Sequence, residues 1–325
     1  MHVDDHASAE RCLRRIGYYR LSAYWYPFRL IQQGPLPPKA SPSSLRSDLF
    51  TSNTGFQDAF EFYVFDKKLR VYVADGLERI EVAMRALIAD RLGARDPHAH
   101  RNPLELDGSF SRKIDNQTGQ PKHQDWLRKQ DSYFARSRED FATHFRAKYP
   151  ASVAPIWIAC EVWDWGMLAT FFAGMKPLDK DAIAQKFGNV NGKQLETWLK
   201  AMNHVRNICA HHSRLWNKGL NVIPALPKRG LVLDLDHLPR GNDPALSRIY
   251  VLLVIMRVML KTIHPTRSDW HRRIVSHALS APSNSPISAS RAGFPSGWDK
   301  QEIWSPSNSR PRFLDRIRHW LRKFV

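Results

Sequence analysis

The sequence predicts an all-α protein, a helical bundle with additional helices and long loops. Apolar residues recur at three- and four-residue spacing through residues 56–92 and again through residues 192–216, which is the period of an amphipathic helix. No segment shows a strong strand pattern, and no internal repeat is present. The 325 residues, 43% of them hydrophobic, supply enough apolar material for a packed core.

The N-terminal part of the chain is expected to contain short helices and then long ones. Residues 1–33 predict a short helix that leads into the aromatic segment IGYYRLSAYWYPF, and prolines and serines make QQGPLPPKASPSS a linker. Residues 56–92 predict two long helices or one bent helix, because Gly76 interrupts the pattern. Residues 93–130 are rich in turn residues, so a loop is expected there, with helices resuming near Asp131.

The C-terminal part predicts mainly buried helices. PIWIACEVWDWGMLATFFAGM starts with proline at a helix entry and is apolar on nearly every face, which favours one central buried helix. Gly188 is a plausible helix stop, and the next long helix begins around Gly192. A further helix is expected at about 244–263, where the apolar run IYVLLVIM is too short to cross a bilayer. Short segments ending in AGFPSGWDKQEIW follow.

Charge and cysteine content indicate a cytoplasmic protein that binds a polyanion. The 49 Lys and Arg against 31 Asp and Glu give a net charge of +18, which favours nucleic acid or an anionic membrane surface as partner, with a merely solubilising charge as the alternative. Cys12, Cys160 and Cys209 are too few and too far apart for a disulfide framework or a CxxC site. The acidic N-terminus lacks the apolar core of a secretory signal.

The last residues form a segment of their own. Residues 305–325 carry six Arg or Lys and one Asp, and we separate this basic amphipathic tail from a main domain at residues 1–304. A helix would place five apolar side chains of the tail on one face: Phe313, Leu314, Ile317, Leu321 and Phe324. Such a tail can bind RNA, contact a membrane surface or dock on the body of the protein.

Titratable groups gather in AMNHVRNICAHHSRLWN, residues 201–217. If this segment is a helix, it has an apolar stripe made of Leu195, Trp198, Met202, Val205, Cys209 and Trp216. Asn203, Asn207 and His211 follow at one-turn spacing on the opposite face, while Arg206 and His212 lie about 60° to either side of Cys209. The segment therefore combines a core-facing stripe with a polar one.

The polar residues suit phosphodiester cleavage. Histidine can accept and donate a proton near neutral pH, and arginine offers a permanently charged fork for a phosphate, so no metal or other cofactor is needed. Arg206 and His211 point about 140° apart on a straight helix, so we expect a two-fold dimer to complete the site. His204 and His211 lie about 10 Å apart along the axis, too far to share one metal ion. The simpler alternative is that these residues only cap and hydrogen-bond within a bundle.

Several blocks of the sequence occur in the order of a known family. RNICAHHSRLWN resembles the signature of the Abi-like (AbiD/AbiF) family of bacterial abortive-infection systems, which belongs to the HEPN superfamily. IGYYRLSAYWYPF, FDKKLRVYVADGLERIEVAMRALIA, PIWIACEVWDWG and GFPSGW are similar to further blocks of that family. The resemblance covers about residues 3–304 and leaves the basic tail outside. Family members usually have more chain before IGYYRLS, so we expect a truncated or mis-assigned start.

The resemblance implies a HEPN-type helical bundle, frequently dimeric, with an Arg-polar-x-x-x-His ribonuclease motif. Carried onto this sequence, the motif gives Arg206, Asn207 and His211, and His212 also fits the looser spacing of the superfamily. The implied activity is that of a metal-independent endoribonuclease toxin acting in phage defence. Some relatives occur with a small noncoding RNA as antitoxin.

Two acidic residues are candidates to support the motif, and two functions other than RNA cleavage are open. Glu161 and Glu81 are candidates to orient Arg206 through a charge-assisted hydrogen bond, although pairing with Arg79, Arg85 or Arg20 explains them as well. In place of a ribonuclease, the chain could be a catalytically silent RNA-binding module or a regulator that binds the antitoxin RNA. A third hypothesis is a basic interaction protein that its tail directs to a membrane.

Overall fold

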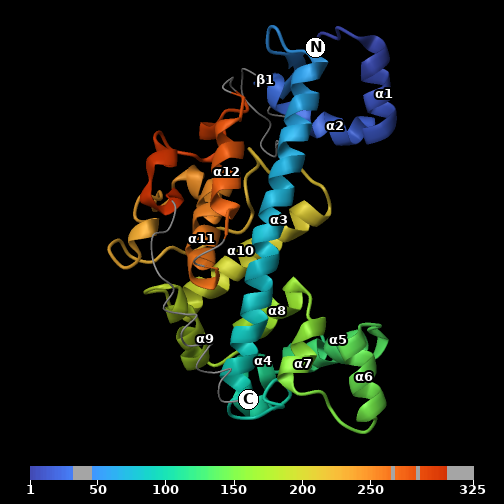
Figure 1. Cartoon of the computed structure of the whole chain (residues 1–325), viewed down its shortest axis with the longest axis vertical. Helices are drawn as coiled ribbons and strands as arrows, with labels where there is room; N and C mark the ends of the chain where they lie inside the picture. Colours follow the sequence, from blue (N-terminus) through green and yellow to red (C-terminus); the bar gives the residue numbers. More distant parts are fainter. Residues whose placement is uncertain (32–45, 265–267, 283–285, 306–325) are drawn as a thin grey trace.

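The structure is a computed structural model that describes residues 1–31, 46–264, 268–282 and 286–305. Within these residues the regular structure is mainly helical, which confirms the predicted all-α class (Figure 1). The helices and strands are α1 (His6–Ile16), α2 (Tyr18–Trp25), β1 (Arg29–Ile31), β2 (Arg46–Phe50), α3 (Phe56–Gly93), α4 (Gly108–Ser111), α5 (Lys122–Arg136), α6 (Asp140–Lys148), α7 (Ile156–Ala159), α8 (Trp165–Ala173), α9 (Pro177–Ala184), α10 (Gly192–Ala210), α11 (Ile249–Ile263) and α12 (Trp270–Leu279). The expected linker at 32–44 and the tail beyond Ser305 lie outside the described residues.

Helix α3 is the axis of the molecule. It runs unbroken for 38 residues, with α1 and α2 near one end, α4 to α7 near the other, and α11 and α12 along one side (Figure 1). Gly76 does not interrupt it, contrary to one reading of the sequence. A Cβ at Gly76 would lie 2.7 Å from Nε1 of Trp270 and 2.8 Å from Cε of Met256. The glycine therefore serves the close packing of α11 and α12 on α3, at the cost of about 1 kcal/mol in helix propensity.

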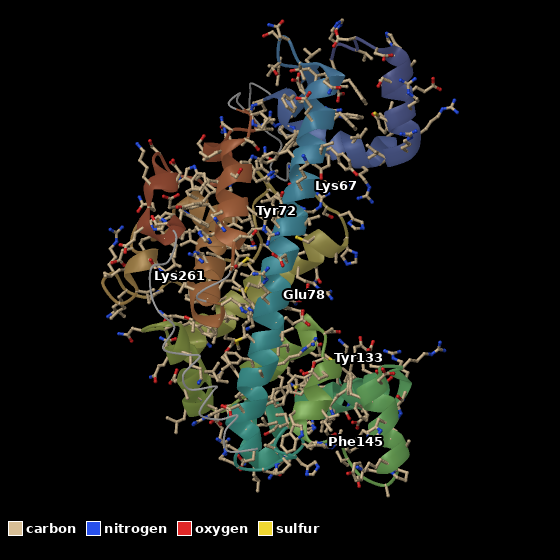
Figure 2. All side chains as sticks on the ribbon, viewed as in Figure 1. Lys67, Tyr72, Glu78, Tyr133, Phe145 and Lys261 are labelled. Carbon is tan, nitrogen blue, oxygen red and sulfur yellow. The ribbon has the colours of Figure 1, made fainter. Side chains whose placement is uncertain are left out.

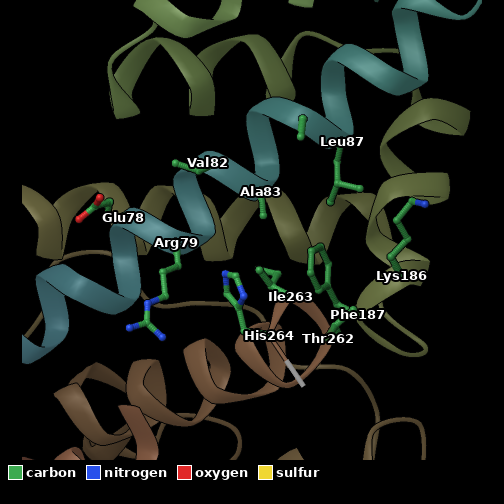
Figure 3. A pocket seen from close by; sticks show the side chains of 11 residues that line it. Glu78, Arg79, Val82, Ala83, Leu87, Lys186, Phe187, Thr262, Ile263 and His264 are labelled. Atoms are coloured by element: carbon green, nitrogen blue, oxygen red, sulfur yellow. The ribbon is translucent and has the colours of Figure 1, made fainter. Parts of the chain in front are cut away.

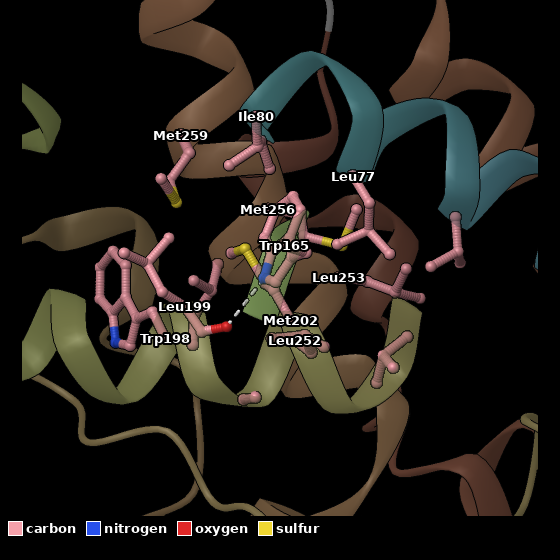
Figure 4. Close-up of a cluster of buried hydrophobic side chains, with 14 of the residues drawn as sticks. Leu77, Ile80, Trp165, Trp198, Leu199, Met202, Leu252, Leu253, Met256 and Met259 are labelled. Atoms are coloured by element: carbon pink, nitrogen blue, oxygen red, sulfur yellow. Dashed lines mark hydrogen bonds between the residues drawn. The ribbon is translucent and has the colours of Figure 1, made fainter. Parts of the chain in front are cut away.

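The core forms where α10 and α11 pack against α3 and α8. Figure 4 shows Leu77 and Ile80 of α3 facing α11 and α10, with Trp165 of α8 between them. The indole of Trp165 is fully buried, and its Nε1 donates to the carbonyl oxygen of Leu199 at 3.1 Å. Residues 249–260 of α11 are all buried, so the apolar run at the start of α11 is a core helix as predicted.

Two boundaries differ from the sequence expectation. The segment expected to be one buried helix is divided into α7, a 3₁₀ turn (Cys160–Val162) and α8, because Asp164 starts a new helix by accepting the backbone N–H of Met167 at 2.7 Å. Helices also resume earlier than residue 131, since α5 begins at Lys122 directly after Pro121. In addition, β1 and β2 pair as a small antiparallel sheet that no sequence signal predicted.

The start of α10 agrees with the prediction and its end does not. The Asn191 side chain accepts the N–H of Gln194 at 2.9 Å, and the Gln194 side chain accepts the N–H of Asn191 at 3.0 Å, a capping box that fixes the helix start. The helix ends at Ala210, so the histidine pair and Trp216 lie beyond it. The expected angles therefore hold for the stripe from Leu195 to Cys209, which is buried, and not for residues 211–217.

Candidate active site

The four residues of the predicted motif meet at the C-terminal end of α10. Arg206 and Asn207 are exposed on its last turn, and Nη1 of Arg206 lies 3.4 Å from Oδ1 of Asn207. His211 and His212 follow directly and are also exposed. A guanidinium, an amide and two imidazoles are thus presented to solvent within one short stretch of chain.

The backbone beyond α10 fixes where the histidines stand. The N–H of Ser213 donates to the carbonyl of Ile208 at 3.0 Å, and that of His212 donates to Cys209 at 3.1 Å, the two bonds of a Schellman motif. His212 occupies the left-handed position of this motif, with φ of 57°, where glycine is usual. A left-handed conformation costs an L residue about 1–2 kcal/mol. Such strain persists where surrounding bonds hold the backbone, and it is frequent at functional sites.

A buried ionic cluster holds the chain that follows the histidines. The Asp66 carboxylate of α3 accepts the backbone N–H groups of Leu215, at 3.1 and 3.2 Å, and of Trp216, at 2.7 Å. It also accepts the hydroxyl of Tyr24 at 2.8 Å and forms a salt bridge with Arg70. The side chains of Asp66 and Arg70 are 0% and 6% exposed, so water does not replace these bonds. We call Tyr24, Asp66 and Arg70 the buried anchor.

Burial and neighbouring charges shift the pKa values of Tyr24 and Asp66 in the buried anchor. Burial and then the adjacent Asp66 carboxylate raise the pKa of Tyr24, so its hydroxyl stays protonated and can donate. Burial also raises the pKa of Asp66, while the charge of Arg70 and the backbone N–H groups lower it. Arg70 therefore has a structural function: it makes a carboxylate tolerable at this depth.

Helix α2 contacts the same turn from across the sequence. Nη1 of Arg20 donates to the carbonyl oxygen of His212 at 3.0 Å, and Nη1 of Arg214 donates to the carbonyl of Ala23 at 2.7 Å. The aromatic segment that contains α2 therefore has a second function besides packing, since it braces the histidine turn.

Sequence reasoning missed these supporting residues. One signal for the buried anchor was available: Asp66 and Arg70 stand four residues apart among the apolar positions Phe62, Phe65 and Leu69, a place where charges need partners. Tyr24 lies 42 residues before Asp66, and the backbone N–H groups that Asp66 accepts lie about 150 residues after it, so no spacing rule connects these partners.

Two cavities flank the turn, and His212 lines both. The first, of about 370 Å³, lies between α3 and the end of α10, and its lining includes Lys67, Glu81, Arg206 and His212, together with Glu78. Figure 2 shows Lys67 and Glu78 at successive levels along α3.

The second cavity, of about 460 Å³, lies between α2 and the turn. Its lining includes Tyr19, Arg20, His211, His212 and Lys218. Within one chain, Arg206 therefore shares a cavity with His212 and not with His211.

The two predicted supporting acids pair with another arginine. Glu81 lies 2.5 Å from Nη2 of Arg85, and Glu161 lies 3.6 Å from Nη1 of the same residue. Neither carboxylate hydrogen-bonds to Arg206 in the described structure, and Glu161 is half exposed in a 3₁₀ turn, not inside an apolar helix. Burial raises the pKa of Glu81, and the charges of Arg85 and Arg206 oppose this. Glu81 thus faces Arg206 across a cavity without bonding to it.

Another cavity is unrelated to the motif. It measures about 360 Å³ between α3, the 3₁₀ turn Gln185–Phe187 and the end of α11, and Figure 3 shows Val82, Leu87, Phe187 and Ile263 around it. None of the predicted motif residues lines this cavity.

Three further features concern metal ligands, cysteines and membrane-spanning helices. The described residues contain no group of three or more His, Cys, Asp or Glu placed to hold a metal ion. All three cysteines are free. In the part of the chain that the structure describes, no helix combines the length and the apolar run needed to span a membrane.

A comparison with protein families decides the relationship. The model of the Abi-like protein family matches residues 11–217, more than half of the chain. The chain belongs to the Abi-like protein family. In this Abi-like protein the match ends directly after Trp216, so it contains the motif residues and the buried anchor. The GFPSGW block at 293–298 lies beyond it, which makes the match shorter than the resemblance predicted.

Membership gives the general role of this Abi-like protein. Its family is that of abortive-infection proteins, which implies a part in phage defence. No curated protein and no solved structure matches the chain.

Proposed function

We propose that this Abi-like protein is a metal-independent endoribonuclease toxin that arrests growth during phage infection. The observation that supports this most strongly is the joint exposure of Arg206, Asn207, His211 and His212 on a turn that buried bonds hold in place. Exposed polar groups on a rigid support are the arrangement that catalysis by positioning requires.

The chemistry proposed is transesterification within RNA. One histidine removes the proton of a ribose 2′-hydroxyl, whose oxygen attacks the adjacent phosphorus. The bond to the 5′-oxygen breaks, and a second histidine protonates that leaving oxygen. A 2′,3′-cyclic phosphate and a free 5′-hydroxyl result. Arg206 binds the phosphoryl oxygens as negative charge develops, and Asn207 orients the substrate or a histidine.

We infer that a second copy of the chain completes the site. Arg206 and His211 of one chain line separate cavities that share His212, which favours a second chain as the source of the group that completes each site. A two-fold arrangement of two α10 ends would bring two arginines and up to four histidines into one cleft. We keep His211 as the base, and its neighbour His212, which shares a cavity with Arg206, is the natural candidate for the acid.

A second function has one observation in its favour. The cavity at His211 is lined by Arg20, Arg214 and Lys218 and, among its described lining residues, by no carboxylate. Such a surface binds a polyanion whether or not it cleaves it. A catalytically silent RNA-binding module, or a regulator that binds a small antitoxin RNA, would use the same groups.

The deciding experiment combines growth arrest with RNA cleavage in EDTA. Wild type should arrest growth and cleave RNA, while Arg206→Ala and His211→Ala should each lose about 10²-fold or more in cleavage rate. His144→Ala and Arg138→Ala are matched controls, because both residues are exposed and far along the chain from the motif. Equal cleavage by all variants would contradict the catalytic assignment. Tight RNA binding by a wild type that does not cleave would favour the silent module.

A further inference from the structure

We propose that Tyr19 and the second cavity form a nucleotide subsite for single-stranded RNA, in which the Tyr19 ring stacks on one base and Lys218 and Arg20 bind the neighbouring phosphate. The inference rests on the proposed function for its substrate. It adds a substrate form and three residues, Tyr19, Arg20 and Lys218, that the ribonuclease motif does not include.

The Tyr19 ring is largely open to solvent. The residue is 89% exposed, and its one ring neighbour among the described residues is Tyr18, in a T-shaped contact with ring centroids 5.5 Å apart. Tyr18 in turn packs on Trp25 at 5.2 Å, which gives the aromatic pair a buried support. Aromatic faces of this kind are the platforms on which proteins stack unpaired bases.

The cavity beside Tyr19 attracts phosphate. Three of its lining side chains are the cations Arg20, Arg214 and Lys218, and its described lining contains no Asp or Glu. Lys218 is exposed, and the ion pairs that lysines form within the described part of the chain involve other lysines. Burial, and then the charge of Lys218, lower the pKa of His204. An exposed cation beside an open aromatic ring matches the two parts of a nucleotide.

The ring and the histidines stand in a fixed relation. Two hydrogen bonds hold α2 against the turn. Arg20 of α2 donates to the carbonyl of His212, and Arg214 of the turn donates to the carbonyl of Ala23 in α2. Tyr19 and His211 line the same cavity of about 460 Å³. A base held on Tyr19 therefore belongs to a nucleotide close to the phosphate that the histidines reach.

The ring favours single strands over duplexes. In an A-form duplex the bases are already stacked on each other and turn their edges inward, so a protruding aromatic ring gains little. In a single strand each base has a face to offer, and one such stack contributes about 1–3 kcal/mol.

The test measures binding of an oligonucleotide that the protein cannot cleave. A fluorescent 2′-O-methyl RNA strand lacks the attacking hydroxyl, so wild type and variants are compared by anisotropy as intact full chains. Tyr19→Ala should weaken binding about tenfold, and Tyr19→Trp should retain it. Tyr149→Ala is the matched control, since Tyr149 is 45% exposed on another part of the molecule. The same strand as a duplex, and a strand of abasic residues, should be insensitive to Tyr19→Ala.

Charge and catalysis are read out separately. Lys218→Gln should lower the salt dependence of binding by about 0.7 in the log–log slope, the value for one phosphate contact on a single strand. Equal affinity of wild type and Tyr19→Ala, an equal loss on the abasic strand, or an unchanged slope for Lys218→Gln would overturn the subsite. If cleavable RNA is cut but Tyr19→Ala binds normally, the subsite fails and the ribonuclease stands. If Tyr19→Ala weakens binding but no RNA is cut, the subsite stands and the ribonuclease fails.

Discussion

The end of α10 has a buried half and an exposed half, and the two treat polar groups in opposite ways. In the buried half, the anchor of Tyr24, Asp66 and Arg70 saturates its carboxylate with two backbone N–H groups, a hydroxyl and a guanidinium. In the exposed half, Arg206 makes one hydrogen bond within the described residues, at 3.4 Å to Asn207, and both histidines are exposed. Leu215 and Trp216, whose N–H groups the anchor holds, follow His212 within a few residues.

The contrast teaches how one segment can be both rigid and reactive. Desolvation penalises every hydrogen bond that a buried polar group fails to make, so the groups of the buried anchor are paired with one another and have no capacity left for substrate. Exposed groups give little stability, so they are free to bind a phosphate or move a proton. The buried anchor is therefore expected to supply stability and the exposed motif to supply chemistry, and mutations of each can test this division.

The largest effect is expected from Asp66→Ala. This change leaves Arg70 charged and unpaired at 6% exposure and removes the acceptor of two backbone N–H groups. The free energy of unfolding should fall by about 3–5 kcal/mol. Denaturant titration measures it, with Glu10→Ala as control, because Glu10 pairs with Arg14 on the surface and should cost under about 1 kcal/mol. Similar losses for both variants would remove the distinction between the two halves.

The buried His100 should make the free energy of unfolding depend on pH. Burial, and then the charge of Arg101, lower the pKa of His100 from 6.5 to about 3, and neither ring nitrogen has a hydrogen-bond partner among the residues that the structure describes. The unfolded chain takes up this proton first, so stability present above pH 6.5 is lost as the pH falls toward 3, at up to about 1.4 kcal/mol per pH unit. Unfolding titrations between pH 7 and 5 should show a smaller slope for His100→Leu than for wild type. Parallel slopes would contradict the assignment.

His212→Gly separates backbone strain from side-chain function. Glycine accepts the φ of 57° without the penalty that histidine bears, so the free energy of unfolding should rise by about 0.5–1 kcal/mol. RNA cleavage should fall at the same time, because the imidazole is gone. Thermal unfolding and a cleavage assay on one sample measure both. A variant that is more stable and fully active would mean that His212 has no part in the chemistry.

The smallest effect is expected from Glu81→Gln. Glu81 pairs with Arg85 and only faces Arg206 across a cavity, and Arg85 retains its 2.5 Å bond to the carbonyl of Trp163. Because glutamine at this position can still accept a hydrogen bond from Arg85, stability should change by about 1 kcal/mol or less. RNA cleavage should stay within about threefold of wild type. A hundredfold loss of cleavage would instead make Glu81 a positioning residue for Arg206.

The sequence predicted the helices and the motif better than it predicted the support of the motif. Periodicity found the buried stripe of α10 and its start, and a capping signal at Asn191 explains why that start was visible. The end of α10 was missed because His212 takes a conformation that usually signals glycine, and no glycine stands there. Gly76 suggested a break in α3 that does not occur. A glycine stands there because the indole of Trp270 packs too closely for a Cβ.

The remaining parts of the site depend on contacts distant in sequence. Nothing near Asp66 reveals that its partners are the N–H groups of Leu215 and Trp216, and nothing near Tyr19 places it beside His211. Glu81 and Glu161 were candidates by composition, but the choice between Arg85 and Arg206 depends on distances of a few ångströms. Local sequence patterns predict the helices, whereas tertiary packing determines which charged side chains come into contact.

The most direct test of the account is the rate of RNA cleavage by Arg206→Ala in EDTA, measured with its free energy of unfolding. Arg206 is exposed and belongs to no ion pair in the described structure, so its removal should leave stability within about 0.5 kcal/mol of wild type. The account predicts a cleavage rate at least about a hundredfold lower at this unchanged stability. Cleavage at the wild-type rate, or a loss of activity matched by a loss of stability, would contradict it.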